Sequence, residues 1–209
     1  MLGTAKEKII RKRIALLERI PFVRLAVISG SCVTGNATDD SDIDVIIGAK
    51  DNRIYLCRAL TLLTCDLLNV RNRPPRPERD KLCLSHFMSM SDLRMNNPEN
   101  SYEADSYPFL FPVYGKSSDC AAFFRMNAHI IKEVPDYEQY SLYIGGKKHW
   151  LARLAEKTLS GKLGDMLEKW TQKKQIRRIQ ERAKALMGKG RKMRVITRPN
   201  RVETYYEIY

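Results

Sequence analysis

Apolar and polar residues alternate with a helical period at the start of the chain. Thr4-Ala5-Lys6-Glu7 has the form of a capping box, in which Thr and Glu side chains bond free amides at a helix start. Apolar residues recur at helical spacing from Ile10 to Leu17, and Pro21 stops the run because proline cannot continue a helix. The pattern predicts a helix over residues 5–19.

Apolar runs separated by turn residues follow this helix. The runs at residues 22–29, 43–48 and 81–88 predict buried strands, and residues 31–37 and 52–69 predict a short and a longer helix. Residues 71–79 contain prolines and arginines, so we expect an extended basic loop before the third strand.

The local signals weaken after residue 88. Residues 89–118 are rich in Asn, Ser and Pro and predict an irregular segment, and residues 118–134 predict a helix. Helices with one apolar face follow Gly145-Gly146, and residues 193–206 predict a closing hairpin. We divide the chain into an N-terminal helix (1–21), a core (22–115) and a mainly helical, basic C-terminal region (116–209).

Charge is spread unevenly along the 209 residues, whose net charge is +13. Residues 1–146 carry 19 Lys or Arg against 18 Asp or Glu, whereas residues 147–209 carry 18 against 6. The excess indicates a polyanion as the partner of the C-terminal region, and we expect RNA, with an anionic membrane surface as the alternative. A basic surface that only faces solvent is the plainer interpretation.

Membrane insertion is not supported by the sequence. The most apolar helix candidate, Ile54–Val70, is interrupted by Arg58 and Asp66 and is too short to span a bilayer. The N-terminus has no small-residue cleavage site of a secretory signal. The five cysteines form no Cys-x-x-Cys pair, so reduced thiols and a cytoplasmic location are the simplest expectation.

A Gly-Ser pair and two aspartates flank the predicted short helix. Gly30 permits the close approach of an anion, and Ser31 begins a helix whose free amides attract phosphate. Asp42 and Asp44 are one residue apart on an extended segment, so they point to the same face, roughly 6 to 7 Å apart along the chain. Mg²⁺ takes oxygen ligands and keeps positions for water and phosphates. The segment predicts a phosphate cradle beside a metal site.

Other interpretations of this segment are weaker. Two of its glycines have the Walker spacing, but Asn36 and Ala37 stand where that loop needs Lys and Ser or Thr, which excludes a P-loop. An EF-hand starting at Asp40 lacks the sixth-position Gly and the twelfth-position Glu, which argues against calcium. A solvated acidic turn remains as the alternative, and it describes Asp39 better than the two aspartates at the strand.

Gly30-Ser31, ten intervening residues, Asp42-Ile43-Asp44 and the apolar Val45-Ile46-Ile47 resemble the signature of the nucleotidyltransferase superfamily typified by DNA polymerase beta, in its minimal single-domain form. The resemblance implies an α/β (α+β) fold with a mixed sheet and flanking helices. It also implies transfer of a nucleoside monophosphate from a nucleoside triphosphate to a hydroxyl, with Gly30 and Ser31 holding the triphosphate and Asp42 and Asp44 holding magnesium.

The family usually has a third carboxylate on the following strand, where it completes the metal site and assists deprotonation of the hydroxyl. The expected strand, residues 81–88, contains no acid. Asp80 at its edge is the first candidate, ahead of Asp66 and Asp92. His86 is a further candidate base, but a lone histidine in an apolar strand is more often a packing residue.

The resemblance, added to the predicted metal site, implies a Mg²⁺-dependent nucleotidyltransferase with Asp42, Asp44 and Asp80 as the expected catalytic residues. RNA, a protein side chain or a small molecule is the hydroxyl acceptor, and the basic C-terminal region favours RNA. The alternative is a non-catalytic protein that binds RNA or nucleotide through a degenerate transferase site.

Overall fold

A mixed sheet with helices on both faces forms the centre of the molecule. The computed structural model describes residues 4–73, 78–95, 104–131, 134–140, 142–188 and 193–206. The elements in chain order are α1 (Thr4–Ile14), the 3₁₀ helix η1 (Ala15–Arg19), β1 (Val23–Ser29), α2 (Ser31–Thr34), β2 (Ile43–Ala49), α3 (Ile54–Leu67), β3 (Leu82–Ser89), the 3₁₀ helix η2 (Ala104–Phe109), β4 (Phe111–Tyr114), α4 (Ser117–Met126), the 3₁₀ helix η3 (Tyr137–Gln139), α5 (Trp150–Thr158), α6 (Lys162–Met187), β5 (Met193–Arg198) and β6 (Arg201–Tyr206).

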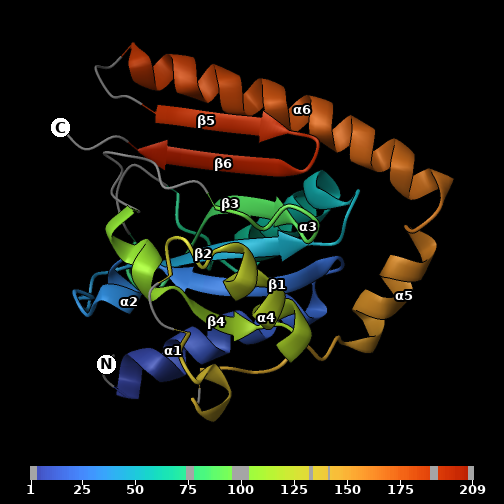
Figure 1. Cartoon of the computed structure of the whole chain (residues 1–209). Coiled ribbons are helices and arrows are strands. Elements are labelled where there is room, and N and C mark those ends of the chain that lie inside the picture. Colours follow the sequence, from blue (N-terminus) through green and yellow to red (C-terminus); the bar gives the residue numbers. More distant parts are fainter. Residues whose placement is uncertain are drawn as a thin grey trace.

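The six strands lie in the order β4-β1-β2-β3-β6-β5 (Figure 1). β2 and β3 are parallel, with α3 as the crossover between them, and every other neighbouring pair is antiparallel. This arrangement confirms the predicted α/β (α+β) fold with a mixed sheet, and the chain ends in the predicted hairpin, β5–β6.

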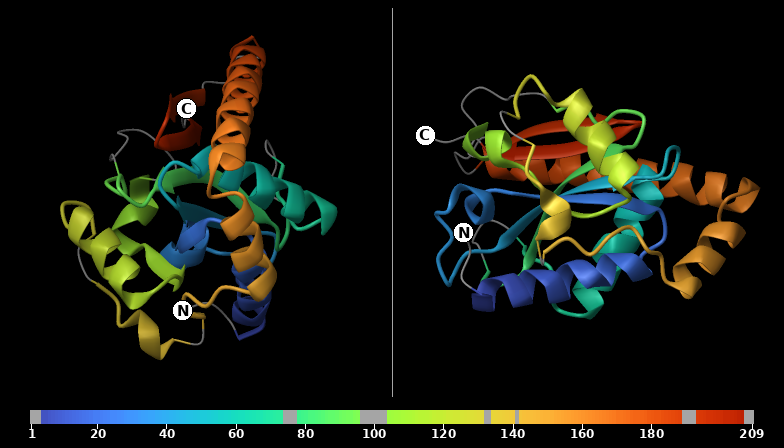
Figure 2. Two further views of the ribbon diagram at one scale, coloured as in Figure 1. Left: turned by 90° about the vertical axis from the view of Figure 1, so that its right-hand side faces the viewer. Right: turned by 60° about the horizontal axis from the view of Figure 1, so that its bottom comes forward.

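Alternate residues of the strands face two different hydrophobic layers. Val45 and Ile47 of β2 pack in the layer that contains Ile10 of α1 and Tyr55 of α3, whereas Ile46 packs in the layer formed by α4 and its neighbours. Figure 2 shows α4 on one side of the sheet and α3 and α6 on the other. Both faces of the central strands are therefore covered, which explains why β1 and β2 are continuous apolar runs in the sequence.

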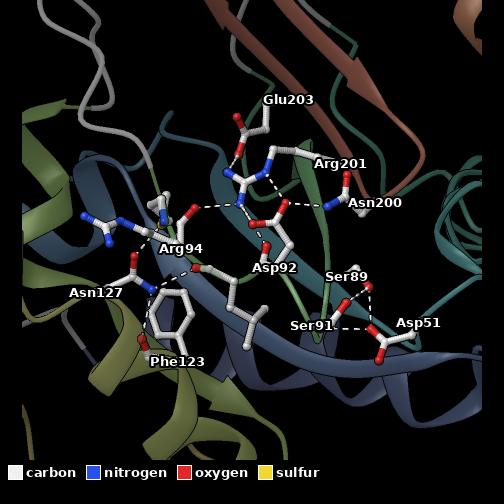
Figure 3. Close-up of polar contacts among 12 residues, drawn as sticks. Asp51, Ser89, Ser91, Asp92, Arg94, Phe123, Asn127, Asn200, Arg201 and Glu203 are labelled. Carbon is white, nitrogen blue, oxygen red and sulfur yellow. Dashed lines mark hydrogen bonds and ion pairs between the residues drawn. The ribbon is translucent and has the colours of Figure 1, made fainter.

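The C-terminal hairpin is tied to the core by the guanidinium of Arg201 (Figure 3). This group forms ion pairs at 2.8 Å with both Asp92 and Glu203, and it donates to the carbonyl oxygen of Arg94 at 2.6 Å. Asn200 donates to the second oxygen of Asp92 at 2.8 Å. Because Arg201 is buried together with Glu203, the hairpin is part of the same folded unit as β3.

Helix α6 lies along α3 through specific polar contacts. The carboxylate of Glu168 accepts hydrogen bonds from the first amides of α3, those of Tyr55 at 2.9 Å and Leu56 at 2.8 Å. It thereby caps α3 from a distant part of the chain. Gln175, two turns along α6, donates to the carbonyl oxygen of Tyr55 at 2.7 Å. These contacts fix the register between the two helices.

The structure corrects several details of the predicted elements. The short helix expected over residues 31–37 ends at Thr34. The helix expected over residues 5–19 changes at Ala15 from α-helix to 3₁₀ helix. The segment expected to be irregular contains β4, an edge strand, and its Pro112 is tolerated because an edge position needs fewer backbone donors. The helix expected over residues 118–134 ends at Met126. The division of the chain at residues 21 and 115 stays a prediction.

The five cysteines all lie in the described ranges, and all five are free thiols. Among the helices of the described residues, none combines the length and the apolarity that crossing a bilayer demands.

Candidate active site

Three neighbouring strands place polar residues next to one another at one end of the sheet. Ser29 of β1 pairs with Asp44 of β2, and Asp44 pairs on its other side with Cys83 of β3. Adjacent strands lie about 4.8 Å apart, so residues in register share a small volume. Asp44 is therefore the centre of this group.

The turn after β1 passes directly beside the carboxylate of Asp44. Gly30 has φ 69° and ψ −153°, a conformation that residues with a side chain rarely adopt. A Cβ built on Gly30 would lie 3.0 Å from Cγ of Asp44 and closer still to Oδ2. Only glycine leaves room for that carboxylate. The structure thus brings Gly30 and the adjoining Ser31, the first residue of α2, to the acidic pair.

Asp42 is held by an amide from the loop before β3. Its Oδ2 accepts a hydrogen bond from Nδ2 of Asn72. Burial raises the pKa of Asp42 above its ordinary value, although the Asn72 bond and the charge of Lys6 oppose the shift. Asn72 is itself buried, and its Oδ1 has no hydrogen-bond partner among the described residues. An oxygen without a partner beside a carboxylate is a further possible ligand for a cation.

Asp42, Asp44 and Cys83 each offer one atom to a group whose members all lie within 4.8 Å of one another. Such a group fits a divalent cation. The two carboxylates are the hard oxygen donors that Mg²⁺ prefers, whereas the thiol of Cys83 is a softer donor that suits Zn²⁺ better. The donor set therefore matches the expected metal at two positions and departs from it at the third.

Asp80 lies outside this group and is neutralised by cations. Its carboxylate forms an ion pair with Lys6 at 2.8 Å and another with Arg79 at 3.4 Å. Although burial opposes the shift, the hydrogen bond and charge of Lys6 lower the pKa of Asp80 below its ordinary value. Lys6 also donates to the carbonyl oxygen of Ser41 at 2.6 Å, so this pair braces the backbone next to Asp42.

The other two acids considered as third carboxylates are also engaged elsewhere. Asp66 forms ion pairs at 2.9 Å with both Arg71 and Arg73. Asp92 binds Arg201 in the contacts that hold the hairpin. Neither belongs to the group around Asp44 among the described residues.

His86 is packed in the sheet. Its ring lies edge-on to Tyr205 at 4.8 Å between centroids, and Nδ1 shares a 2.7 Å hydrogen bond with the hydroxyl of Ser85. Burial lowers the pKa of His86 to about 3, and the charge of Arg201 acts in the same direction. The ring is therefore neutral near pH 7, which favours the packing interpretation over a catalytic one.

Sequence reasoning missed three residues of this site. Cys83 was visible in the expected strand, but only the β2–β3 register places it beside Asp44. Asn72 lies in what was expected to be a loop, where an amide carries no recognisable signal. Lys6 lies in α1, 35 residues before Ser41 in the sequence, so no local pattern could connect it with the acidic pair.

The similarity to known proteins covers the segment that carries this geometry. Residues 8–81 match the family model described as the nucleotidyltransferase domain. The match includes Gly30, Ser31, Asp42 and Asp44 and ends before Cys83. No curated protein and no solved structure matches the chain.

Proposed function

We propose that the chain transfers a nucleoside monophosphate from a Mg-nucleoside triphosphate to a hydroxyl acceptor, because residues 8–81 match the family model of the nucleotidyltransferase domain. The observation that carries the proposal is the contact between the Gly30 turn and the carboxylate of Asp44. A phosphate held at the turn and a cation held by the carboxylate are then in direct reach of each other.

Each residue of the site has a task in this reaction. Asp42 and Asp44 hold the cation, and Asn72 fixes the orientation of Asp42. Gly30 keeps the turn clear of side-chain atoms, and Ser31 begins α2, whose first amides have no carbonyl partner within the helix. The cation, when bound, neutralises the charge that develops on the phosphate oxygens and on the attacking hydroxyl.

The thiol of Cys83, beside Asp42 and Asp44 where a third carboxylate is expected, affects the rate of nucleotidyl transfer. Nucleotidyl transfer depends mainly on positioning and charge neutralisation, so two carboxylates support binding of Mg-nucleotide. A general base typically contributes about 10²–10⁴-fold. Since Asp80 is paired with Lys6, we propose Asp80 as a catalytic residue only if that ion pair opens; otherwise the enzyme is slow with Mg²⁺.

RNA is the acceptor that the charge distribution favours. The exposed face of α6 carries Lys173, Lys174, Arg177 and Arg178, with Glu181 as the one acid nearby. Contacts of such residues with phosphates give affinity that depends on salt rather than on base sequence. The free thiols support a reducing compartment, so we propose a cytoplasmic location.

Cys83 also favours a second candidate function. A domain that has lost the third carboxylate can keep its affinity for nucleotide or RNA while it no longer transfers nucleotides. In this form the chain is a non-catalytic binding protein with a degenerate site, and its nucleotide binding still requires Asp42 and Asp44.

Transfer from each α-labelled nucleoside triphosphate with Mg²⁺, in the presence and absence of bulk RNA, separates the two functions. We expect labelled RNA with the wild type and none with Asp44→Asn. Asp39→Asn is the matched control, because Asp39 is an exposed acid of the preceding turn. Label that Asp44→Asn transfers as well as the wild type contradicts the proposed site. Metal-dependent nucleotide binding without transfer identifies the binding protein.

A further inference from the structure

A hollow that shares no residue with the group around Asp44 lies between α3 and α6. Its volume is about 410 Å³, which falls in the range of ligand pockets. Guanidinium groups surround it: Arg58 from α3, Arg71 from the segment before β3, and Arg178 and Arg182 from α6. Asp66 is the acid in its lining.

Arg58 is a half-buried member of this arginine cluster. One of its terminal nitrogens donates to the neutral amide of Gln175 at 2.7 Å, and its guanidinium lies over the ring of Phe87, 5.6 Å from the centroid. Its Nε is buried and has no hydrogen-bond partner among the described residues. Burial, together with the charges of Arg71 and Arg182, lowers the pKa of Arg58 to about 10. Within the described ranges no carboxylate pairs with Arg58, although a partly buried guanidinium is stabilised by an anion.

The acid in the lining does not supply that anion. Both oxygens of Asp66 are engaged, one by Arg71 and the other by Arg73, each at 2.9 Å. Arg178 and Arg182 stand four residues apart on the exposed side of α6, where like charges repel each other. The described part of the hollow therefore holds an excess of positive charge that a bound anion would relieve.

We propose that this hollow binds a phosphate group of a single-stranded RNA. Planar guanidinium groups pair with phosphate oxygens through two parallel hydrogen bonds, which suits arginines better than lysines. The positive surface continues along α6 beyond the hollow through Lys173 and Lys174, and the ammonium of Lys174 lies 4.0 Å from the exposed ring of Trp170. A polymer can use that extension, whereas a free phosphate ion cannot.

The hollow also borders the proposed active site along the chain. Arg71 lines the hollow, and the next residue, Asn72, donates to Asp42. Adjacent residues thus connect the hollow with the acidic pair, and an RNA bound at the hollow would be the acceptor of the proposed transfer. This acceptor role rests on the proposed nucleotidyl transfer, but the binding of RNA phosphate at the hollow does not.

Binding of a short fluorescein-labelled single-stranded RNA to the full chain, followed by fluorescence anisotropy, tests the site. Arg178→Met/Arg182→Met removes two exposed charges from the hollow, and Lys173→Met/Lys174→Met removes two from the same helix outside it. Because both double variants lose the same net charge, a difference between their RNA affinities measures the contribution of the hollow. We expect the arginine pair to weaken binding at least about tenfold more than the lysine pair.

Single variants test Arg58 in the same way. Arg58→Met keeps the packing on Phe87 and loses the charge, and Arg177→Met is its control on the outer face of α6. We expect Arg58→Met to weaken RNA binding more than Arg177→Met, and to leave the melting temperature without RNA unchanged or raised. Asp44→Asn should bind RNA as the wild type does, so that a failure of transfer and a failure of this site give different results.

Equal losses for the arginine and lysine pairs would overturn the proposal, because binding would then follow net charge alone. The proposal would also be overturned if the wild type bound no RNA while inorganic phosphate raised its melting temperature and the arginine variants abolished that rise. This result would indicate a site for a small anion. Binding of anionic vesicles but not of RNA would assign the surface to a membrane instead.

Discussion

Replacing Gly30 by alanine tests the contact on which the proposed active site depends. The added Cβ lies 3.0 Å from Cγ of Asp44 and 3.2 Å from its Cβ, whereas carbon atoms in van der Waals contact are about 3.5–4.0 Å apart. The carboxylate of Asp44 must therefore move by roughly 0.5–1 Å or more. The backbone of Gly30 is also in a region nearly closed to alanine, which costs about 1–3 kcal/mol.

These two effects can be separated by a second glycine in the same segment. Gly35 also has positive φ, at 80°, but a Cβ there meets nothing within 4 Å. Gly35→Ala thus introduces backbone strain of about 1–2 kcal/mol and leaves Asp44 in place. At about 2–4 °C per kcal/mol for a chain of this size, we expect Gly35→Ala to lower the melting temperature by about 2–8 °C and Gly30→Ala by about 2–12 °C.

The discriminating measurement is the melting temperature with and without Mg-nucleotide. A ligand at a hundred times its dissociation constant stabilises the fold by about 2.7 kcal/mol. Wild type and Gly35→Ala should both show that stabilisation, and Gly30→Ala should lose it because Asp44 is displaced. Nucleotide-induced stabilisation of Gly30→Ala equal to that of the wild type would refute the view that the turn and the carboxylate act together.

Three further perturbations follow from the structure. Cys83→Asp places a third carboxylate beside Asp42 and Asp44, so we expect the initial rate of Mg²⁺-supported transfer to rise at least about tenfold. A rate at or below that of the wild type would mean that residue 83 does not occupy the place of the third carboxylate. His86 is buried and neutral, and its pKa of about 3 lies below the ordinary 6.5. Because the unfolded chain binds a proton at this position below pH 6.5 and the folded chain does not, the contribution of His86 to stability is present above pH 6.5 and is lost as the pH falls toward 3. The loss is up to about 1.4 kcal/mol per pH unit. Urea unfolding at several pH values should show a flatter profile for His86→Leu than for the wild type, and identical profiles count against this. Asp92→Asn weakens the pairing of buried Arg201 and should lower the free energy of unfolding by roughly 1–3 kcal/mol. Its control, Glu181→Gln, breaks an exposed ion pair and should change the free energy of unfolding by less than about 0.5 kcal/mol. Equal changes would mean that other contacts hold the hairpin.

Local chemistry accounts for what could be predicted from the sequence. The helical spacing of apolar residues in α1, the Gly30-Ser31 turn and the Asp-x-Asp at the start of β2 are local patterns of a few residues, so they can be recognised without knowledge of the fold. The apolar runs of β1 and β2 are likewise local, because each strand is buried on both faces.

The third position of the site depends instead on how two strands align. Asp44 pairs with Cys83, but two residues later Ile46 pairs with His86, so the β2–β3 ladder contains an irregularity between those pairs. A strand shifted by one residue would present Leu82 or Leu84 to Asp44. Asp80 is the acid nearest to β3 in the sequence, but its backbone has a φ of 59° and its carboxylate forms an ion pair with Lys6, which stabilises the loop. No property of residues 80–83 alone determines which of them reaches Asp44.

The charge distribution along the sequence likewise could not reveal which arginines meet around the hollow. Composition places the positive excess in residues 147–209, but two of the four arginines around the hollow, Arg58 and Arg71, belong to residues 1–146, which are almost neutral overall. They meet Arg178 and Arg182 because Glu168 caps α3 and Gln175 bonds Tyr55, which sets the register of α6 along α3. Glu168→Gln weakens that cap without touching an arginine. If register assembles the hollow, this variant should lower RNA affinity as the arginine variants do; unchanged affinity would mean that the arginines bind RNA independently of one another.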